Sequence, residues 1–366
     1  MEQVDRPQEI IPPNAGIERD NEVRELSKKV ERLHEIEYAP GFENYAAVAP
    51  MFEQELKDKV RLRFSWGKDA PNMSAKHFDP SNNETPEGNL QNYDDFLESQ
   101  GFTLPPDTAH IIGNFQGTQY QKEEVATDPS DPHFEEQLEL SANFVFTRNP
   151  NITLTIKPAD CPIVIGYCKD KFGNDLVFID HSGADAANAS MSRQGLLYLR
   201  DELGVDLSKI KAVMLPGVSK ENYFITNEPE RRGNGISEES WKDAIDQKYP
   251  DYIVEGLLQS SPGFAEMSPA QKEAKREEIR NGQKRHVDIP EATIWQLVDA
   301  GIPPENIQAI IVDSYESARN GEAYSHRFTT ENGGKRKGRG IVAVQLLSNK
   351  VTEQEIPDRA NLPKAA

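Results

Sequence analysis

Two side chains in the stretch TIKPADCPIVIGYCKDKFGNDLVFIDHSGADA, residues 155–186, have types that do chemistry in proteins. Cys161 and His181 each stand beside an aspartate, at Asp160 and Asp180. A cysteine and a histidine together can ligate a metal ion, or can act as a nucleophile with its base. The same residue types also occur as a small buried apolar residue and a locally hydrogen-bonded ring. The residue types alone leave these alternatives open.

The spacing of the two residues predicts that they share one face of a β-hairpin. The apolar segments CPIVIGYC and LVFIDH flank KDKFGND, whose composition is typical of a turn. A hairpin centred near Phe172 places His181 opposite Ile163 and Cys161 opposite Gly183. A register slip of one residue would move one of the two side chains to the other face. In the centred register they occupy diagonal positions roughly 7–8 Å apart at the backbone, within reach of joint ligation or a hydrogen bond.

The second cysteine, Cys168, is predicted to face the other side of the same strand, because it is seven residues from Cys161. Two cysteines on opposite faces do not bond each other. Two cysteines in 366 residues also exclude a disulfide framework. We therefore expect a reducing compartment, the cytoplasm.

The composition excludes several classes of partner. The net charge is −20, the pI is about 4.9 and the mean hydropathy is −0.69. An acidic chain repels phosphate backbones, so we expect no nucleic acid partner. The sequence lacks an apolar run of roughly 18 residues and a signal peptide pattern, so we expect no membrane association. We expect a cytoplasmic protein with a small-molecule substrate, and the composition does not indicate an oligomeric state.

Strand-like and helix-like segments mix without a strict alternation, which predicts an α+β fold. A helix over about 187–204 is expected to end at Gly204, and another is expected between Asp288 and Gly301. A strand that runs into a loop is expected at KVRLRFSWGKDAPNMS, and further strands are expected at HIIGNFQGTQY, ANFVFT, ITLTIK, CPIVIGYC, LVFIDH, KIKAVMLPG, NYFIT, IQAIIVDS and GIVAVQLL. A basic loop is expected between the last two of these strands.

The chain is predicted to have one large domain with additions. Apolar residues at helical spacing predict an amphipathic helix over about 17–37, through Val23, Leu26, Val30 and Leu33. The polar stretch that includes AEMSPAQKEAKREEIRNG reads as an insertion with one helix. The expected divisions are an N-terminal tail and helix at 1–59, a catalytic domain at 60–350 with a polar insertion at 227–285, and a flexible tail at 351–366.

The order of several motifs resembles the laccase-domain family, also called YfiH-like. The motifs are PADCPIVI, IDHSG, KAVMLPGVSKENYFI, HVDIPEATIWQLVDAGIPPENI and YSHRF followed by GRGIVAVQLL, between about residues 60 and 350. Members of that family are described as multicopper polyphenol oxidases and as purine nucleoside phosphorylases with adenosine deaminase activity. The resemblance implies a layered mixed-sheet sandwich and an enzyme whose substrate is similar to a purine nucleoside.

The resemblance also implies which residues form the site. The family holds zinc or copper with a cysteine and two histidines, which correspond here to Cys161, His181 and Gln116 in NFQG. An amide oxygen is a poor ligand for these metals, so Zn²⁺ or Cu binding is expected to be weak unless His110 or His133 completes the set. The family's Trp-Arg pair is replaced within HSGADA, which removes a bidentate donor for phosphate and weakens the case for phosphorolysis.

The resemblance implies substrate contacts from Ser325 and Arg327 in YSHRF, and Asp160 beside Cys161 is a further expected contact. The adjoining GGKRKGRG segment fits either a lid over an anionic substrate or a solvated loop. The fold type also resembles Cys–His hydrolases such as bacterial toxin deamidases. In that alternative Cys161 is the nucleophile and His181 the base, without a metal. A third alternative is a non-catalytic binding protein that keeps the scaffold.

Overall fold

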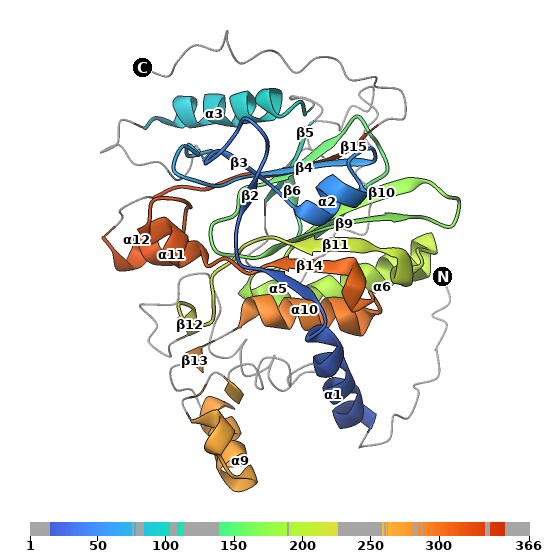
Figure 1. Ribbon diagram of the computed structural model, residues 1–366, viewed down its shortest axis with the longest axis vertical. Helices are drawn as coiled ribbons and strands as arrows, with labels where there is room; N and C mark the ends of the chain where they lie inside the picture. The colour runs from blue at the N-terminus through green and yellow to red at the C-terminus, as the bar shows by residue number, and fades with distance from the viewer. Residues whose placement is uncertain are drawn as a thin grey trace.

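The computed structural model describes the chain at residues 15–74, 77, 84–102, 108–112, 139–188, 190–225, 258–259, 261, 263–280, 285–286, 288–333 and 337–347. Two β-sheets lie face to face in this part of the chain, with helices on the outer side of each (Figure 1). The predicted α+β fold with layered mixed sheets is therefore confirmed.

The first sheet contains the residues of the predicted hairpin. Its strand order is β1-β14-β11-β9-β10-β7, with β1 and β14 parallel and β9 antiparallel to both of its neighbours. The strands are β1 (Glu31–Leu33), β7 (Phe144–Thr147), β9 (Ile163–Lys169), β10 (Asp175–His181), β11 (Lys211–Met214) and β14 (Ile307–Ile310).

The second sheet has the strand order β2-β3-β4-β15-β8-β5-β6. Its strands are β2 (Glu37–Tyr38), β3 (Ala46–Val48), β4 (Val60–Ser65), β5 (Thr108–Ile112), β6 (Glu139–Ser141), β8 (Thr153–Ile156) and β15 (Val342–Leu346). A separate short pair joins β12 (Phe224–Ile225) to β13 (Arg285–His286).

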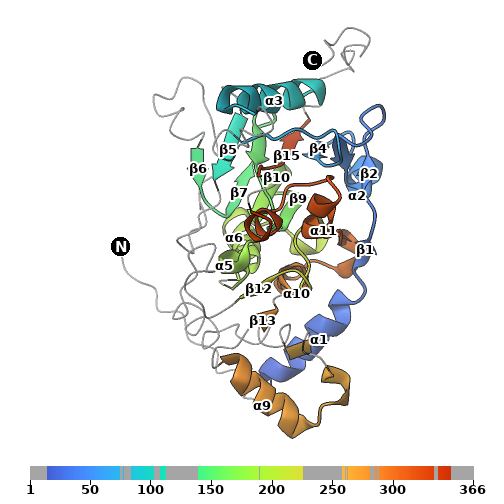
Figure 2. The same cartoon turned by 90° about the vertical axis from the view of Figure 1, so that its left-hand side faces the viewer.

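Helices cover the two outer faces, as two views show (Figures 1 and 2). One helix, α3 (Pro86–Ser99), packs on the second sheet, and three helices lie under the first: α5 (Ala184–Asn188), α6 (Met191–Leu203) and α10 (Ile289–Ala300). The remaining helices are α1 (Ala15–Ser27), α2 (Pro50–Glu55), α9 (Pro269–Arg280), α11 (Ser314–Arg319) and α12 (His326–Glu331), with single 3₁₀ turns at Leu207–Lys209, Phe264–Glu266 and Pro304–Asn306.

Side chains of the β9–β10 hairpin alternate between two cores, as a period of two requires. Ile163 and Ile179 pack in the core between the sheets. Phe178 and Cys168 pack in the core beneath the helices. Cys161 precedes Ile163 by two residues and is therefore expected on the same side of the strand as Ile163, which faces the other sheet. Cys168 lies on the helix side of the sheet, in agreement with the prediction that it faces away from the side of Cys161. Neither cysteine forms a disulfide bond within the described part of the chain.

The helix caps that the sequence predicts are present. Asp288 accepts a hydrogen bond from the Glu291 amide at the start of α10, and Gly301 ends this helix with φ 116°. Gly204 ends α6 with φ 65°, a left-handed conformation that favours glycine. The helix expected over about 187–204 is interrupted, because Ser190 takes φ 54° and separates α5 from α6.

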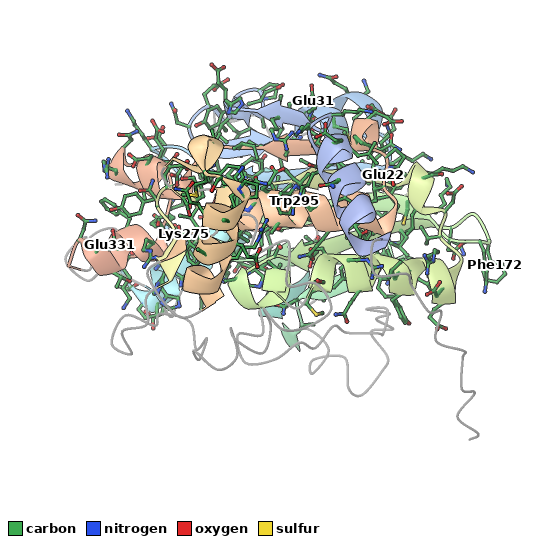
Figure 3. The ribbon with its side chains drawn as sticks, turned by 90° about the horizontal axis from the view of Figure 1, so that it is seen from below. Glu22, Glu31, Phe172, Lys275, Trp295 and Glu331 are labelled. Carbon is green, nitrogen blue, oxygen red and sulfur yellow. The ribbon has the colours of Figure 1, made fainter. Side chains whose placement is uncertain are left out.

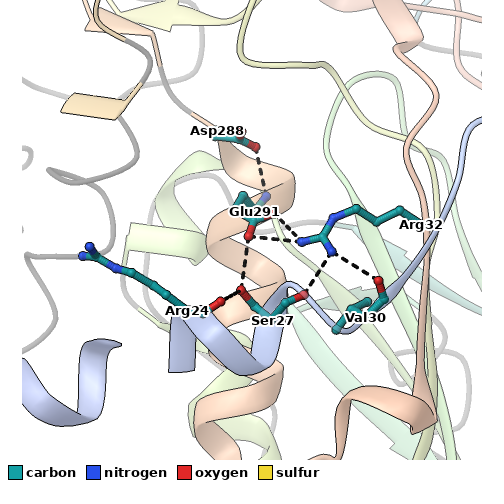
Figure 4. Close-up of polar contacts among 6 residues, drawn as sticks. All are labelled: Arg24, Ser27, Val30, Arg32, Asp288 and Glu291. Carbon is teal, nitrogen blue, oxygen red and sulfur yellow. Dashed lines mark hydrogen bonds and ion pairs between the residues drawn. The ribbon is translucent and has the colours of Figure 1, made fainter. Parts of the chain in front are cut away.

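The N-terminal helix is shorter than predicted. It ends at Ser27, and within the stretch expected to continue it to about 37, Glu31–Leu33 form strand β1, which pairs with β14. Arg32 and Ser27 both bond the Glu291 carboxylate (Figure 4), with Arg32 Nη2 to Glu291 Oε2 at 2.9 Å. This contact holds β1 and α1 against α10. The apolar spacing correctly predicts that Val23 and Val30 are buried. It does not predict that the helix ends at Ser27.

The segment predicted as a basic loop contains two short helices. Asp313 and Ser325 accept hydrogen bonds from the amides of Tyr315 and Phe328, and these caps start α11 and α12. In the described residues of the 227–285 insertion, the predicted helix is present as α9. The proposed division into 1–59, 60–350 and 351–366 stays a prediction. The described helices include none that is both long and apolar enough to span a membrane.

Candidate active site

The register of the β9–β10 hairpin agrees with the prediction. His181 pairs with Ile163, and every pair from Asp175 with Lys169 onward keeps the same register. Beyond the strand ends, the Ser182 amide donates to the Pro162 carbonyl at 3.0 Å. The strands therefore bring the residues around Cys161 next to those around His181. Figure 3 shows Phe172, at the hairpin turn, and Glu331, at the end of α12, on opposite ends of the molecule.

Cys161 and His181 converge on the backbone of Gly183. A Cβ atom added at Gly183 would lie 3.2 Å from Cys161 Sγ, 3.2 Å from His181 Cε1 and 3.5 Å from His181 Nε2. The thiol and the Nε2 edge of the ring are thus neighbours at this point. Cys161 is half-buried and His181 is buried. The two residues singled out from the sequence are brought together, with the thiol on the accessible side.

His181 is buried, and it is hydrogen-bonded to the uncharged residue Asn143. Burial lowers the pKa of its imidazole to about 4, so the ring is neutral at neutral pH. Its Nδ1 lies 3.1 Å from Asn143 Oδ1, and its backbone amide donates to the Asn143 carbonyl at 2.7 Å. A neutral imidazole carries one lone pair, which can accept a proton or a metal ion.

Asp180 faces away from the site, toward α6. Its side chain is fully buried, and Ser192 Oγ donates to its Oδ2, while its Oδ1 has no hydrogen-bond partner among the residues that the structure describes. Burial raises the pKa of this carboxyl to about 7, and the Ser192 hydrogen bond opposes the shift. Because Asp180 points to the helix layer, it is not positioned to oppose a thiolate at Cys161 directly.

Asp160 ties three segments together beside Cys161. Its Oδ1 accepts a hydrogen bond from Ser314 Oγ at 2.8 Å, and its Oδ2 accepts one from the Arg327 amide at 2.8 Å. Its backbone carbonyl accepts from the Val218 amide at 2.8 Å. Both carboxylate oxygens are therefore engaged by protein donors that anchor α11 and α12. A substrate contact by Asp160 stays a prediction.

The two other predicted substrate contacts, Ser325 and Arg327, lie at the start of α12. Ser325 is buried, and its hydroxyl accepts from the Phe328 amide as the helix cap. The Arg327 guanidinium lies 5.2 Å from the centroid of the Tyr223 ring, and its Nε is 3.7 Å from Glu331 Oε1. Ser325 thus caps the helix, and Arg327 contacts Asp160 through its backbone amide while its guanidinium lies near Tyr223 and Glu331.

Positive charge gathers near the thiol. Burial lowers the pKa of Arg339, and electrostatic interactions with Asp160 and Cys161 oppose that shift. Burial also lowers the pKa of His326; Arg339 and Arg327 lower it further, while Asp160 raises it. These couplings place Arg339 within electrostatic reach of Asp160 and Cys161, and His326 within reach of Asp160. A cation near a thiol favours the thiolate form.

The donor set tests the expected metal. Cys161 and His181 supply one sulfur and one nitrogen, whereas zinc sites in proteins use three or four protein ligands. Within the described residues, no group of three or more histidine, cysteine, aspartate or glutamate side chains is arranged to hold a metal ion. Gln116 and His133 lie outside the described residues, and His110 lies in β5. The described donors do not fit a zinc or copper site on their own.

A pocket between the sheets borders the same segment. Its lining includes the aromatic residues Phe64, Trp66 and Tyr324, together with Ala159 and Ile163 on either side of the Asp160–Cys161 pair. The free space is about 30 Å³, which is room for water molecules and not for a purine ring. A substrate that reaches Cys161 must therefore bind outside this pocket.

The close approach at Gly183 gives a first testable result. In Gly183→Ala, the new methyl group would enter the space between Cys161 Sγ and the His181 ring, at a separation tighter than most real Cβ contacts. We expect iodoacetamide to alkylate Cys161 several-fold more slowly, with little change in the melting temperature. Gly88→Ala in α3 is the matched control and should leave alkylation unchanged. Equal alkylation rates in Gly183→Ala and the wild-type protein would contradict the convergence.

Sequence reasoning missed several residues of this site. Asn143 and Ser314 act through side-chain hydrogen bonds across 38 and 154 residues, and only the strand register and packing bring these pairs together. The hairpin register places Gly183 opposite Cys161 but does not predict that Cys161 and His181 converge on it. Arg339 stood in the basic segment without a distinguishing pattern. For Asn143, the available signal was a polar residue at the start of the apolar strand ANFVFT.

Solved structures of other proteins share this fold. The Bacillus licheniformis hypothetical protein YfiH matches over 83% of this chain and 97% of its own, with 16% sequence identity and a TM-score of 0.55. YlmD from Geobacillus stearothermophilus matches over the same shares, 83% and 97%, with 16% identity and a TM-score of 0.54. A DUF152 protein from Neisseria meningitidis matches over 79% and 95%, with 13% identity and a TM-score of 0.50.

No protein-family model and no curated protein matches the sequence. At these low identities the structural likeness shows the fold. The fold expected from the resemblance to the laccase-domain family is confirmed in this way.

Proposed function

We propose that this protein, which shares the fold of YfiH and YlmD, is an enzyme that uses Cys161 as a nucleophile and His181 as its base. The proposed reaction is the hydrolytic removal of an amino group from a small polar molecule similar to a purine nucleoside. The observation that carries the proposal is the convergence of Cys161 Sγ and the His181 Nε2 edge at Gly183. A nucleophile beside its base is the arrangement that covalent catalysis requires.

The proposed first half-reaction removes the amino group. His181 Nε2 accepts the thiol proton as Cys161 Sγ forms a bond to the trigonal carbon that carries the amino group. The resulting imidazolium then gives this proton to the amine, the C–N bond breaks, and ammonia leaves. The substrate carbon is now bound to Cys161.

In the second half-reaction, His181 removes a proton from water as the water oxygen bonds to this carbon. The C–S bond breaks, and the thiolate takes back the proton. The product carries a carbonyl group in place of the amine. The ring is neutral at neutral pH because its pKa is lowered to about 4, so it starts in the form that can accept a proton. A negative charge on Cys161 would raise this pKa during the reaction.

The charges around Cys161 favour this chemistry over the alternatives. Arg339 lies within the electrostatic reach of Cys161 and stabilises a thiolate. The described donors do not complete a zinc or copper site, so the proposed steps use no metal, and metal binding stays a prediction. Phosphorolysis would need donors for phosphate, and the family's Trp-Arg pair is absent from HSGADA. Deamination is therefore the favoured reaction class.

The test is turnover of adenosine by the full chain, with and without inorganic phosphate. We expect inosine and ammonia to form at equal rates in both conditions. Inosine is measured by chromatography and ammonia by an enzymatic assay. The activity should persist after dialysis against a strong chelator, because the proposed steps use only side chains. Cys168→Ala is the control that keeps one cysteine and should retain the rate.

Three outcomes would contradict the proposal. Formation of free base and sugar phosphate only in the presence of phosphate would indicate phosphorolysis. Loss of activity on chelation with recovery on adding zinc would indicate metal catalysis. An absence of turnover across adenosine, guanosine and cytidine would support a non-catalytic binding protein.

A further inference from the structure

We propose that Asn143 is a positioning residue for His181 that fixes its tautomer, so that the Nδ1 proton points to Asn143 and the Nε2 lone pair points to Cys161. Asn143 is absent from the motifs that carry the resemblance, and no step of the proposed reaction uses it. The inference rests on the geometry of the β7–β10 strand pair. It deepens the proposed function, because the function requires a proton acceptor at Nε2.

Two hydrogen bonds from one residue hold His181. Residue 143 lies directly before β7, and the β7–β10 register, in which Asp180 pairs with Phe144, places it opposite His181. The His181 amide donates to the Asn143 carbonyl at 2.7 Å, and His181 Nδ1 lies 3.1 Å from Asn143 Oδ1. Asn143 is 1% exposed and His181 4% exposed, so water does not compete for these bonds.

The hydrogen-bond chemistry of imidazole gives the consequence. A neutral imidazole has one N–H donor and one lone pair, and the partner of one nitrogen decides the role of the other. Asn143 Oδ1 can only accept, so the nitrogen that faces it must carry the proton. The lone pair is then left at Nε2, which is the nitrogen near Gly183 and Cys161. In the reverse tautomer, Nε2 would carry a proton and could not accept one from the thiol.

The arrangement Cys161–His181–Asn143 has the logic of a Cys–His–Asn triad, in which an amide orients the ring of the base. The nucleophile precedes β9, the base ends β10 and the amide precedes β7. Three adjacent strands of one sheet, in the order β9-β10-β7, therefore supply the nucleophile, the base and the amide that bonds the base. A base held by a rigid sheet is oriented more precisely than one on a loop.

The inference can be tested without a substrate. Long-range ¹H–¹⁵N correlation spectra of the full chain report the tautomer of each of its seven histidines, and the signals missing from His181→Gln identify His181. We expect the Nδ1–H tautomer in the wild-type protein. A protonated Nε2 in the wild-type protein would overturn the inference.

Two variants of Asn143 extend the test. Asn143→Leu keeps the size of the side chain but removes the acceptor. In this variant we expect mixed tautomers of His181, and alkylation of Cys161 by iodoacetamide at pH 7 that is at least roughly tenfold slower than in the wild-type protein. Asn143→Asp restores an acceptor for the Nδ1 proton and should restore both the tautomer and the alkylation rate toward the wild-type values. If Asn143 had only a structural role, Asn143→Asp would change the tautomer and the alkylation rate more than Asn143→Leu does, because a buried carboxylate disturbs folding more than leucine.

The controls separate this inference from others. All variants are made in the Cys168→Ala background, so that alkylation reports Cys161 alone. Asn89→Leu in α3 removes another buried amide, whose Nδ2 donates to the Ser74 carbonyl at 3.0 Å, and should leave the His181 tautomer and the alkylation rate unchanged. If the tautomer is as expected but adenosine is not turned over, the proposed function fails and the role of Asn143 stands. If the tautomer is reversed, the role of Asn143 fails whatever the turnover.

Discussion

Replacing Cys161 by alanine is expected to lower kcat/KM for adenosine at least ~100-fold, because the variant loses the atom that bonds to the substrate carbon. The residual rate would come from binding and orientation alone. The fold should persist, since Cys161 is half-buried and lies outside the regular strands. The measurement is the initial rate of ammonia release, with thermal unfolding recorded on the same samples.

The matched control is Cys168→Ala. Cys168 is buried in the core beneath the helices, and burial raises the pKa of its thiol, so it should be inert as a nucleophile. We expect Cys168→Ala to keep its activity and to lose some stability from the small cavity. Similar activity in Cys161→Ala and the wild-type protein would remove the thiol from the mechanism.

Replacing Asp180 by asparagine is expected to stabilise the protein above neutral pH. Burial raises the pKa of the folded carboxyl to about 7, well above the roughly 3.9 of an unfolded aspartate. The folded state therefore binds the proton more tightly. The contribution of Asp180 to stability is fully present below about pH 4 and is lost as the pH rises through about 7. A pKa shift of about three units corresponds to a loss of at most about 4 kcal/mol in the free energy of unfolding at pH 8. Asparagine mimics the protonated carboxyl and avoids this loss.

The measurement is the free energy of unfolding by urea between pH 4 and pH 8, for the wild-type and Asp180→Asn proteins. The difference between the two curves should grow with pH. Taking the difference removes the opposite slope from His181, whose lowered pKa weakens the folded state as the pH falls from about 6.5 to about 4. A difference that stays flat across this range would show that Asp180 is charged in the folded protein.

Asp170 is the control of opposite sign. Burial raises its pKa, but hydrogen bonds from Asn174, Arg148 and the Phe172 amide outweigh this and lower it to about 2. The contribution of Asp170 to the stability of the folded protein is present above the pKa of an unfolded aspartate and is lost as the pH falls through about 2. Asp170→Asn should therefore destabilise the protein at neutral pH, where Asp180→Asn stabilises it.

The sequence was most informative where a local pattern and a turn act together. The composition of KDKFGND predicts a turn between two apolar segments. The register centred on that turn correctly pairs His181 with Ile163. The register follows because a shift by one residue would exchange the contents of the two cores on either side of the sheet. The caps at Asp288 and Gly301 were also predictable, because each acts on residues close in the chain.

Interactions between distant segments were not predictable. The residues after Ser27 have helical spacing, yet they form β1, because the edge of β14 offers backbone partners that a helix would leave unused. Asn143 reaches His181 through a strand pairing that the sequence does not specify. The basic segment contains α12, whose cap at Ser325 is a local signal that the charge pattern obscured.

Both sheets join the beginning of the chain to its end. Leu33 in β1 pairs with Ile310, and Phe64 in β4 pairs with Val342. During synthesis, the strands made first must wait for partners that the ribosome adds close to 280 residues later, as the Glu31–Gln308 separation of 277 illustrates. The early strands remain without these partners for tens of seconds at ordinary translation rates of roughly 5–20 residues per second. A stalled or truncated product would expose two unpaired strand edges.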